Sequence, residues 1–209
     1  DVKHFVPFFQ KNKNLKSFNW YFEPSKNQEN LLEKILESNE ERTTILLESI
    51  ASENLKNFNI YEFYLTFNNF DVLINLFGKN KKLQNIGINN TRLVNSQVID
   101  IINNLRYRAY QINIRFSENS AITPNVVKEI INSLRETKDN REHSYVTVEF
   151  ANQGWDIENY TIGNNHNTHS FNIKLTADYG VEEKPWQYID ISEESSVKYD
   201  SIPQPYEIV

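Results

Sequence analysis

The apolar residues of this chain return at helical spacing in four separate stretches. Apolar side chains at positions i, i+3, i+4 and i+7 lie on one face of a helix. The four quartets are Val2, Phe5, Val6 and Phe9; Phe70, Leu73, Ile74 and Phe77; Val98, Ile101, Ile102 and Leu105; and Val127, Ile130, Ile131 and Leu134. We predict a helix over each quartet, with Pro7 straining the first. Thr123 and Pro124 suit the start of the last helix, as cap and first helical residue.

A further helical pattern fills the interval between residues 29 and 51. It predicts one long helix or two short ones. The inward-facing residues would be Leu32, Ile35, Leu36, Leu46, Leu47 and Ile50.

Short segments with alternating apolar residues follow the helical stretches by five to seven residues. They read Leu15-x-x-Phe18-x-Trp20, Leu55-x-x-Phe58-x-Ile60 and Leu83-x-x-Ile86-x-Ile88, with weaker versions at Ile112-x-Ile114 and Val146-x-Val148-x-Phe150. Alternation of this kind predicts strands with one buried face. Aligned on Phe18, Phe58, Ile86, Ile112 and Val146, the segments recur after 40, 28, 26 and 34 residues.

Strand–helix units of about 28 residues, stacked side by side, are typical of a solenoid, because one unit alone could not bury both of its apolar faces. The segments resemble leucine-rich repeats of the ribonuclease-inhibitor-like type, whose strand signature is L-x-x-L-x-L-x-x-N. The best match is Leu83-x-x-Ile86-x-Ile88-x-x-Thr91, and Glu23, Phe63, Ser117 and Ala151 occupy the asparagine position elsewhere. The resemblance covers residues 1–150 and implies an α/β solenoid. An irregular α/β domain is the alternative.

The pattern stops near residue 150, so we expect a leucine-rich-repeat-like domain over 1–150 and a C-terminal β/extended cap with an acidic tail over 151–209. The stretch SFNIKLTADYG is a candidate strand, and the segment that follows it is acidic and carries three of the six prolines. Terminal caps are expected in solenoids, because the last repeat would otherwise expose an apolar face.

The amino-acid composition argues against several classes of function. The chain has no cysteine, which excludes disulfides and thiolate chemistry. The net charge of −6 argues against general nucleic-acid binding, and no apolar run reaches the length of a membrane span. Asparagine is abundant, and we discount it as functional evidence because it accompanies isoleucine, lysine and tyrosine enrichment. The chain contains no methionine and is expected to be a fragment or a processed product. Its compartment stays open, with a soluble intracellular protein slightly favoured, and use of the sequons at Asn89 and Asn159 is not decided.

No catalytic motif is visible: there is no Gly-rich phosphate loop, no G-x-S-x-G and no H-E-x-x-H. His166 and His169 have a metal-like spacing but stand in a loop-like sequence. We therefore expect no enzyme, no cofactor and no metal. A metal-dependent site around Trp155, Asp156, His166 and His169 is the minority alternative.

The resemblance implies a protein-binding surface along the strands, formed by side chains between and after the buried positions. Carried over residue by residue, that surface holds Asn19, Tyr21, Asn59, Tyr61, Asn89, Asn113, Arg115 and Glu149. Tyrosine and arginine are favoured contact residues. We therefore expect a non-enzymatic interaction scaffold, with a structural subunit docked by its C-terminal tail as the alternative. Clusters at Lys79, Lys81 and Lys82 and at Arg106, Arg108 and Arg115 would suit an acidic partner, the chain's own tail or plain solvation.

Overall fold

The structure is a computed structural model of the 209-residue chain. It describes residues 2–21, 32–63, 65–105, 111–136, 145–151, 153, 155, 160–166, 169–176 and 187–190. The chain divides into two compact units, Asp1–Arg92 and Leu93–Val209, which we call unit 1 and unit 2.

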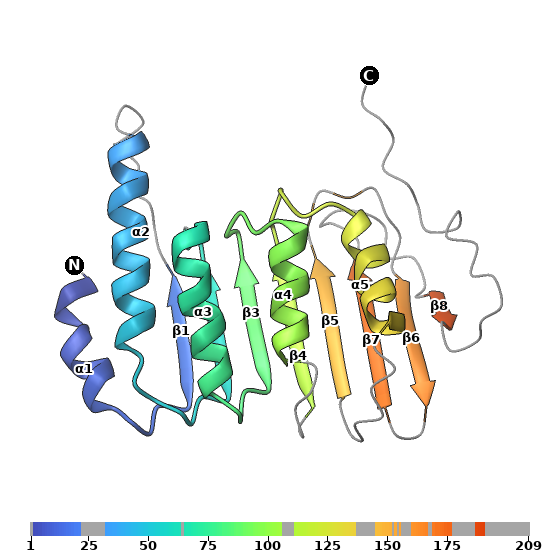
Figure 1. The fold of residues 1–209 in the computed structure, drawn as a ribbon, viewed down its shortest axis with the longest axis horizontal. Helices are drawn as coiled ribbons and strands as arrows, with labels where there is room; N and C mark the ends of the chain where they lie inside the picture. Colours follow the sequence, from blue (N-terminus) through green and yellow to red (C-terminus); the bar gives the residue numbers. More distant parts are fainter. Residues whose placement is uncertain are drawn as a thin grey trace. The chain divides into compact units, whose positions relative to one another are not determined.

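Unit 1 alternates helices with parallel strands, and its helices cover one face of the strands (Figure 1). Its elements are η1 (Val2–His4), α1 (Val6–Lys11), β1 (Ser17–Tyr21), α2 (Leu32–Ser49), β2 (Asn57–Tyr61), α3 (Phe67–Lys79) and β3 (Asn85–Asn89). The pairing aligns Phe18 with Phe58 and Phe58 with Ile86. Parallel neighbours need a crossover connection, and each intervening helix provides it.

Unit 2 begins with the same alternation and ends in a mixed sheet. Its elements are α4 (Asn95–Leu105), β4 (Ile112–Ser117), α5 (Asn125–Glu136), β5 (Tyr145–Ala151), β6 (Tyr160–His166), β7 (His169–Thr176) and β8 (Gln187–Asp190). β4, β5 and β7 pair in parallel, β6 is antiparallel to β7, and β8 is parallel to β6. The candidate strand in SFNIKLTADYG is thus β7, and it joins the parallel strands directly. The expected domain boundary near residue 150 stays a prediction.

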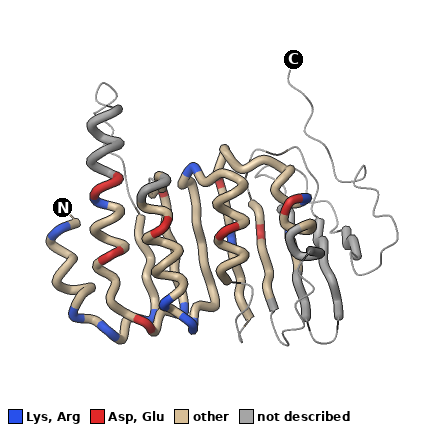
Figure 2. The backbone as a smooth tube through the Cα atoms, viewed as in Figure 1, with Lys and Arg blue, Asp and Glu red and all other residues tan. Residues whose placement is uncertain are grey.

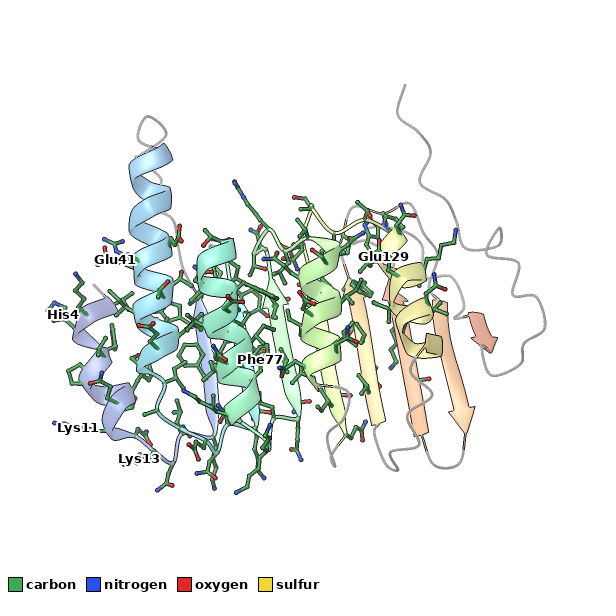
Figure 3. The ribbon with its side chains drawn as sticks, viewed as in Figure 1. His4, Lys11, Lys13, Glu41, Phe77 and Glu129 are labelled. Carbon is green, nitrogen blue, oxygen red and sulfur yellow. The ribbon has the colours of Figure 1, made fainter. Side chains whose placement is uncertain are left out.

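The predicted strands and the helices predicted over the later quartets are confirmed, and the described residues of their apolar stripes form most of the core. The first quartet is divided between η1 and α1, and its Phe5 is 48% exposed. The interval from residue 32 to 49 is one helix, and Leu46, Leu47 and Ile50 are buried beneath it. In α3 the buried residues differ from the predicted quartet. Leu76, which was not predicted, is buried, and Ile74, which was, is only half-buried. Figure 3 shows Phe77 beneath α3, where its ring meets that of Phe58 edge-on at 5.2 Å.

Both proline positions fit their helices. Pro7 lies in the first turn of α1, where a missing N–H costs no helical hydrogen bond, so the expected strain is avoided. Thr123 and Pro124 precede α5, which begins at Asn125, one residue later than predicted. The carbonyl of Thr123 accepts the N–H of Val126 at 3.0 Å. The Thr123 N–H is satisfied by Asn95 Oδ1 at 2.9 Å.

Left-handed backbone conformations follow three of the strands at a constant interval along the sequence. Left-handed residues close three strands, at Glu62, Asn90 and Glu118, with φ of 57°, 50° and 57°. Counted by this 28-residue interval, Ile114 corresponds to Ile86, whereas the sequence prediction matched Ile112. Within unit 2 the predicted match of Ile112 with Val146 is confirmed by the strand register. Because strand side chains alternate with period two, a shift of two residues leaves the apolar pattern unchanged. The apolar pattern therefore does not distinguish the two alignments.

Candidate interaction surface

The strands of unit 1 turn one side-chain row toward the helices and the other away from them. The outward positions form three rows across the strands: Ser17, Asn57 and Asn85; Asn19, Asn59 and Gly87; and Tyr21, Tyr61 and Asn89. Neighbouring parallel strands lie about 4.8 Å apart, so side chains in one row touch. No member of these rows carries a charge, although 24% of the residues in the chain are charged.

The first row is a ladder of amide and hydroxyl groups. Asn57 Nδ2 donates to Ser17 Oγ at 2.9 Å, and Asn85 Nδ2 donates to Asn57 Oδ1 at 2.8 Å. The sequence prediction missed this row, because it considered only positions between and after the buried residues. The same repeat spacing that aligns the strands would have found it.

The second row depends on a glycine. Asn59 Nδ2 donates to Asn19 Oδ1 at 2.7 Å, and the Asn59 carboxamide lies over the β3 backbone at Gly87. A Cβ atom at Gly87 would collide with Asn59 Oδ1. The missing side chain on β3 therefore makes room for the amide pair on the neighbouring strands.

The third row holds the exposed aromatic side chains of this face. Tyr21 is 61% exposed and Tyr61 is 44% exposed, and their ring centroids are 6.1 Å apart. The Tyr21 hydroxyl donates to Glu62 Oε1 at 3.3 Å. The two rings, anchored on neighbouring strands, present one apolar surface with polar tips. Surfaces of this composition are favoured in protein contacts.

Asn89 occupies the expected strand position but is not exposed. Only 3% of its surface is accessible, and Asn89 Nδ2 donates to the Ile60 carbonyl at 3.4 Å. It therefore supports the strand ends instead of offering a contact group, which corrects the expectation for this residue.

Two of the three predicted residues of unit 2, Arg115 and Glu149, carry opposite charges. Asn113 and Arg115 are exposed on β4, and Glu149 is half-buried on β5. Arg115 Nη1 lies 3.9 Å from Glu149 Oε1, and the register places Lys174 of β7 opposite Glu149. An exposed pair at this distance contributes little stability, but it reduces the positive field of Arg115. The outward face of unit 2 thus differs in chemistry from the uncharged face of unit 1.

Buried polar residues tie each repeat to the next in both units. In unit 1, Asn80 is fully buried; its Oδ1 accepts the Leu55 N–H at 3.0 Å, and its Nδ2 donates to the Leu76 carbonyl at 2.9 Å. Ser52 holds the same repeat position, and its hydroxyl donates to the Leu15 carbonyl at 2.7 Å. The sequence prediction overlooked both, because a single polar residue in a loop carries no periodic signal.

In unit 2, the corresponding links lie beyond the carboxyl ends of the strands. Gln153 Oε1 accepts the Asn119 N–H at 3.0 Å, and Gln153 Nε2 donates to the Phe116 carbonyl at 2.8 Å. Asn119 is fully buried and Gln153 is 8% exposed. Each of these residues lies two positions after the one that the sequence prediction placed at the asparagine position, Ser117 and Ala151.

The candidate metal residues divide between described and undescribed positions. His166 ends β6 and His169 begins β7, and the register pairs them at the end of the hairpin. Asp156 lies outside the described residues. Trp155 Nε1 donates to the Ile122 carbonyl at 3.1 Å, which gives this side chain a packing role. Within the described part of the chain, no group of three or more potential metal ligands comes together.

The described helices include none that is long and apolar enough to cross a membrane. The sequence matches no protein-family model, and no curated protein is significantly similar to it.

Proposed function

We propose that this protein is a non-enzymatic interaction scaffold related in architecture to leucine-rich repeats. A protein partner binds to the outward strand face of unit 1. The exposed pair Tyr21 and Tyr61, with Asn19 and Asn59 beside it, carries the proposal. The helices of unit 1 lie on the opposite face and leave these strand positions accessible.

The leucine-rich-repeat relationship is supported by the 28-residue interval of the left-handed residues. Asn119 and Gln153 follow the buried Phe116 and Phe150 by three positions, where the family signature has asparagine. Both are buried and hydrogen-bonded to backbone groups, which is the role that such a ladder needs. Phe63 remains an exception at this position in unit 1.

The chemistry of the surface favours a neutral contact with the partner. Tyrosine supplies contact area at low conformational cost, and asparagine supplies one donor and one acceptor group for main-chain recognition. The three rows carry no charge, and the carboxylate beside them is that of Glu62, which accepts a hydrogen bond from Tyr21. Contact area and neutral hydrogen bonds therefore dominate on this face. Docking through the C-terminal tail is the second candidate, and the tail beyond residue 190 lies outside the described residues.

The proposal is tested by capture from source-cell lysate with Tyr21→Ala/Tyr61→Ala and a matched control, Phe8→Ala/Val94→Ala. Phe8 is 57% exposed and Val94 is 44% exposed, and both lie off the strand face. Removing a contact tyrosine at the centre of an interface costs about 2 kcal/mol, or roughly 30-fold in affinity.

We expect wild type and the control variant to retain the same protein, and the tyrosine variant to lose it. All three proteins need matching circular dichroism spectra. Equal recovery on the tyrosine variant would remove the strand face from the proposal.

A further inference from the structure

Lysines gather at the helix ends and in the three loops that lead into the strands of unit 1. We define the basic edge as residues 11–16, 50–56 and 79–84, which contain seven lysines and one glutamate. The lysines are Lys11, Lys13, Lys16, Lys56, Lys79, Lys81 and Lys82, and all of them are exposed. Figure 2 shows this blue cluster along the lower border of unit 1, beneath α1 to α3, and Figure 3 shows Lys11 and Lys13 pointing away from the protein. The cluster stands out because the whole chain has a net charge of −6.

Hydrogen bonds hold these loops side by side. The Lys56 N–H donates to the Lys16 carbonyl at 2.8 Å, and the Gln84 N–H donates to the Lys56 carbonyl at 2.8 Å. Lys82 Nζ donates to Asn54 Oδ1 at 3.0 Å. The loops therefore continue the strand order, and lysines that are far apart in the sequence become neighbours. Lys16 and Lys56 each immediately precede a strand, and the register places them opposite one another.

The positive charges of the basic edge are not neutralised within the described part of unit 1. None of the seven lysines lies within 4.0 Å of a described carboxylate, whereas Lys3 of η1 pairs with Glu41 at 3.6 Å. Glu53 is the acidic residue of the edge. Like charges at short range repel, so an array of this kind costs stability unless something else requires it.

We propose that the basic edge binds an acidic segment of a protein partner. This inference adds a second surface to the proposed scaffold function, and its chemistry is distinct from the uncharged strand face. Flexible lysines act as point charges that a run of carboxylates can follow in an extended segment. Attraction of this kind accelerates association and makes it sensitive to salt.

Two other polyanions fit the edge less well. The edge contains no aromatic side chain to stack on a base and no arginine to clamp a phosphate with two hydrogen bonds. Leu55 and Leu83 are buried and Leu15 is half-buried, so the loops offer no exposed large apolar residue to insert into a membrane surface. An acidic protein segment needs neither feature.

The test measures binding of a fluorescent octaglutamate peptide to the full chain by anisotropy at low ionic strength. The edge variant is Lys16→Glu/Lys56→Glu, and the control is Arg42→Glu/Lys128→Glu, which makes the same change in net charge at exposed helix positions. We expect at least a tenfold weaker affinity for the edge variant and little change for the control. Wild-type binding should weaken steeply as salt is added. If the edge variant does not fold, Lys11→Glu/Lys81→Glu takes its place.

Parallel titrations use an oligothymidylate and vesicles containing phosphatidylserine. Equal octaglutamate binding by the edge and control variants, or no octaglutamate binding, would overturn the inference. Edge-dependent binding of the oligonucleotide or the vesicles without the peptide would also overturn it. The Tyr21→Ala/Tyr61→Ala variant should bind octaglutamate like wild type, because the peptide probes the edge alone. Failure of the inference is therefore separable from failure of the strand-face proposal.

Discussion

At the scale of single residues, asparagine has different structural roles at different positions. On the strand face, Asn59 bonds to Asn19, while Asn80 is buried and satisfies backbone groups of two elements. A carboxamide can accept and donate at once, which suits it to bridging neighbouring strands. Discounting asparagine on compositional grounds concealed these positions. Their importance follows from their neighbours, because the residue type alone is common throughout the chain.

Gly87→Ala should destabilise the protein by about 1 kcal/mol, because the new Cβ displaces the Asn59 carboxamide and breaks its bond to Asn19. In an Asn59→Ala background the obstacle is gone. The same glycine substitution should then be neutral or slightly stabilising, since alanine restricts the unfolded chain more than glycine does. Urea denaturation of the four proteins of this double-mutant cycle measures the coupling.

Additive effects of Gly87→Ala and Asn59→Ala on the free energy of unfolding would contradict this interpretation. If Gly87→Ala has the same effect with and without the Asn59 side chain, the glycine is not there to accommodate that carboxamide.

At the scale of elements, the loops between helices and strands are held by buried polar groups. Asn80 ends α3 and bonds to the first backbone groups of the neighbouring repeat, and Ser52 does the same one repeat earlier. The sequence predicted the helices and strands because their apolar periods are local. It did not predict these connections, because the partner of each polar group lies one repeat away. Asn80 and Leu55, for example, are 25 residues apart.

Asn80→Ala should lower the free energy of unfolding by about 1 to 3 kcal/mol, because it leaves the Leu55 N–H without its side-chain acceptor in the interior. The Leu76 carbonyl loses the bond from Nδ2 but keeps the one from the backbone N–H of residue 80. Asn54→Ala is the control. Asn54 also bonds across the loops, at 3.3 Å to the Lys13 carbonyl, but its contact is exposed to water. The control should therefore cost less than about 1 kcal/mol. Equal losses in urea denaturation would show that burial of Asn80 does not set its contribution.

At the scale of the whole molecule, charge is sorted by surface. The outward strand face of unit 1 is uncharged, the basic edge is positive, and the corresponding face of unit 2 alternates Arg115, Glu149 and Lys174. The sequence prediction identified Lys79, Lys81 and Lys82 as a local cluster. The four lysines that join them come from the loops before β1 and β2, which the fold brings alongside.

Lys56→Gln should raise the stability of the protein slightly at low ionic strength, because it removes repulsion with Lys16 on the adjacent loop. The gain should vanish near 1 M salt, where the screening length falls to about 3 Å. Lys128→Gln on α5 is the control. The urea midpoints of both variants, measured at low and high salt, give the comparison. A loss of stability for Lys56→Gln at low salt would contradict the mutual repulsion of the edge lysines.

The sequence by itself determined the alternation of helices and parallel strands, the buried apolar residues, and the outward direction of Asn19, Tyr21, Asn59 and Tyr61. These features follow from periods of 3.6 and two residues, which act over a few neighbouring positions. The tertiary structure alone decided the burial of Asn89, the links made by Asn80 and Gln153, and the assembly of the basic edge. Each of these depends on which residues of different repeats become neighbours, and a pattern with period two cannot distinguish one pairing from another shifted by two residues.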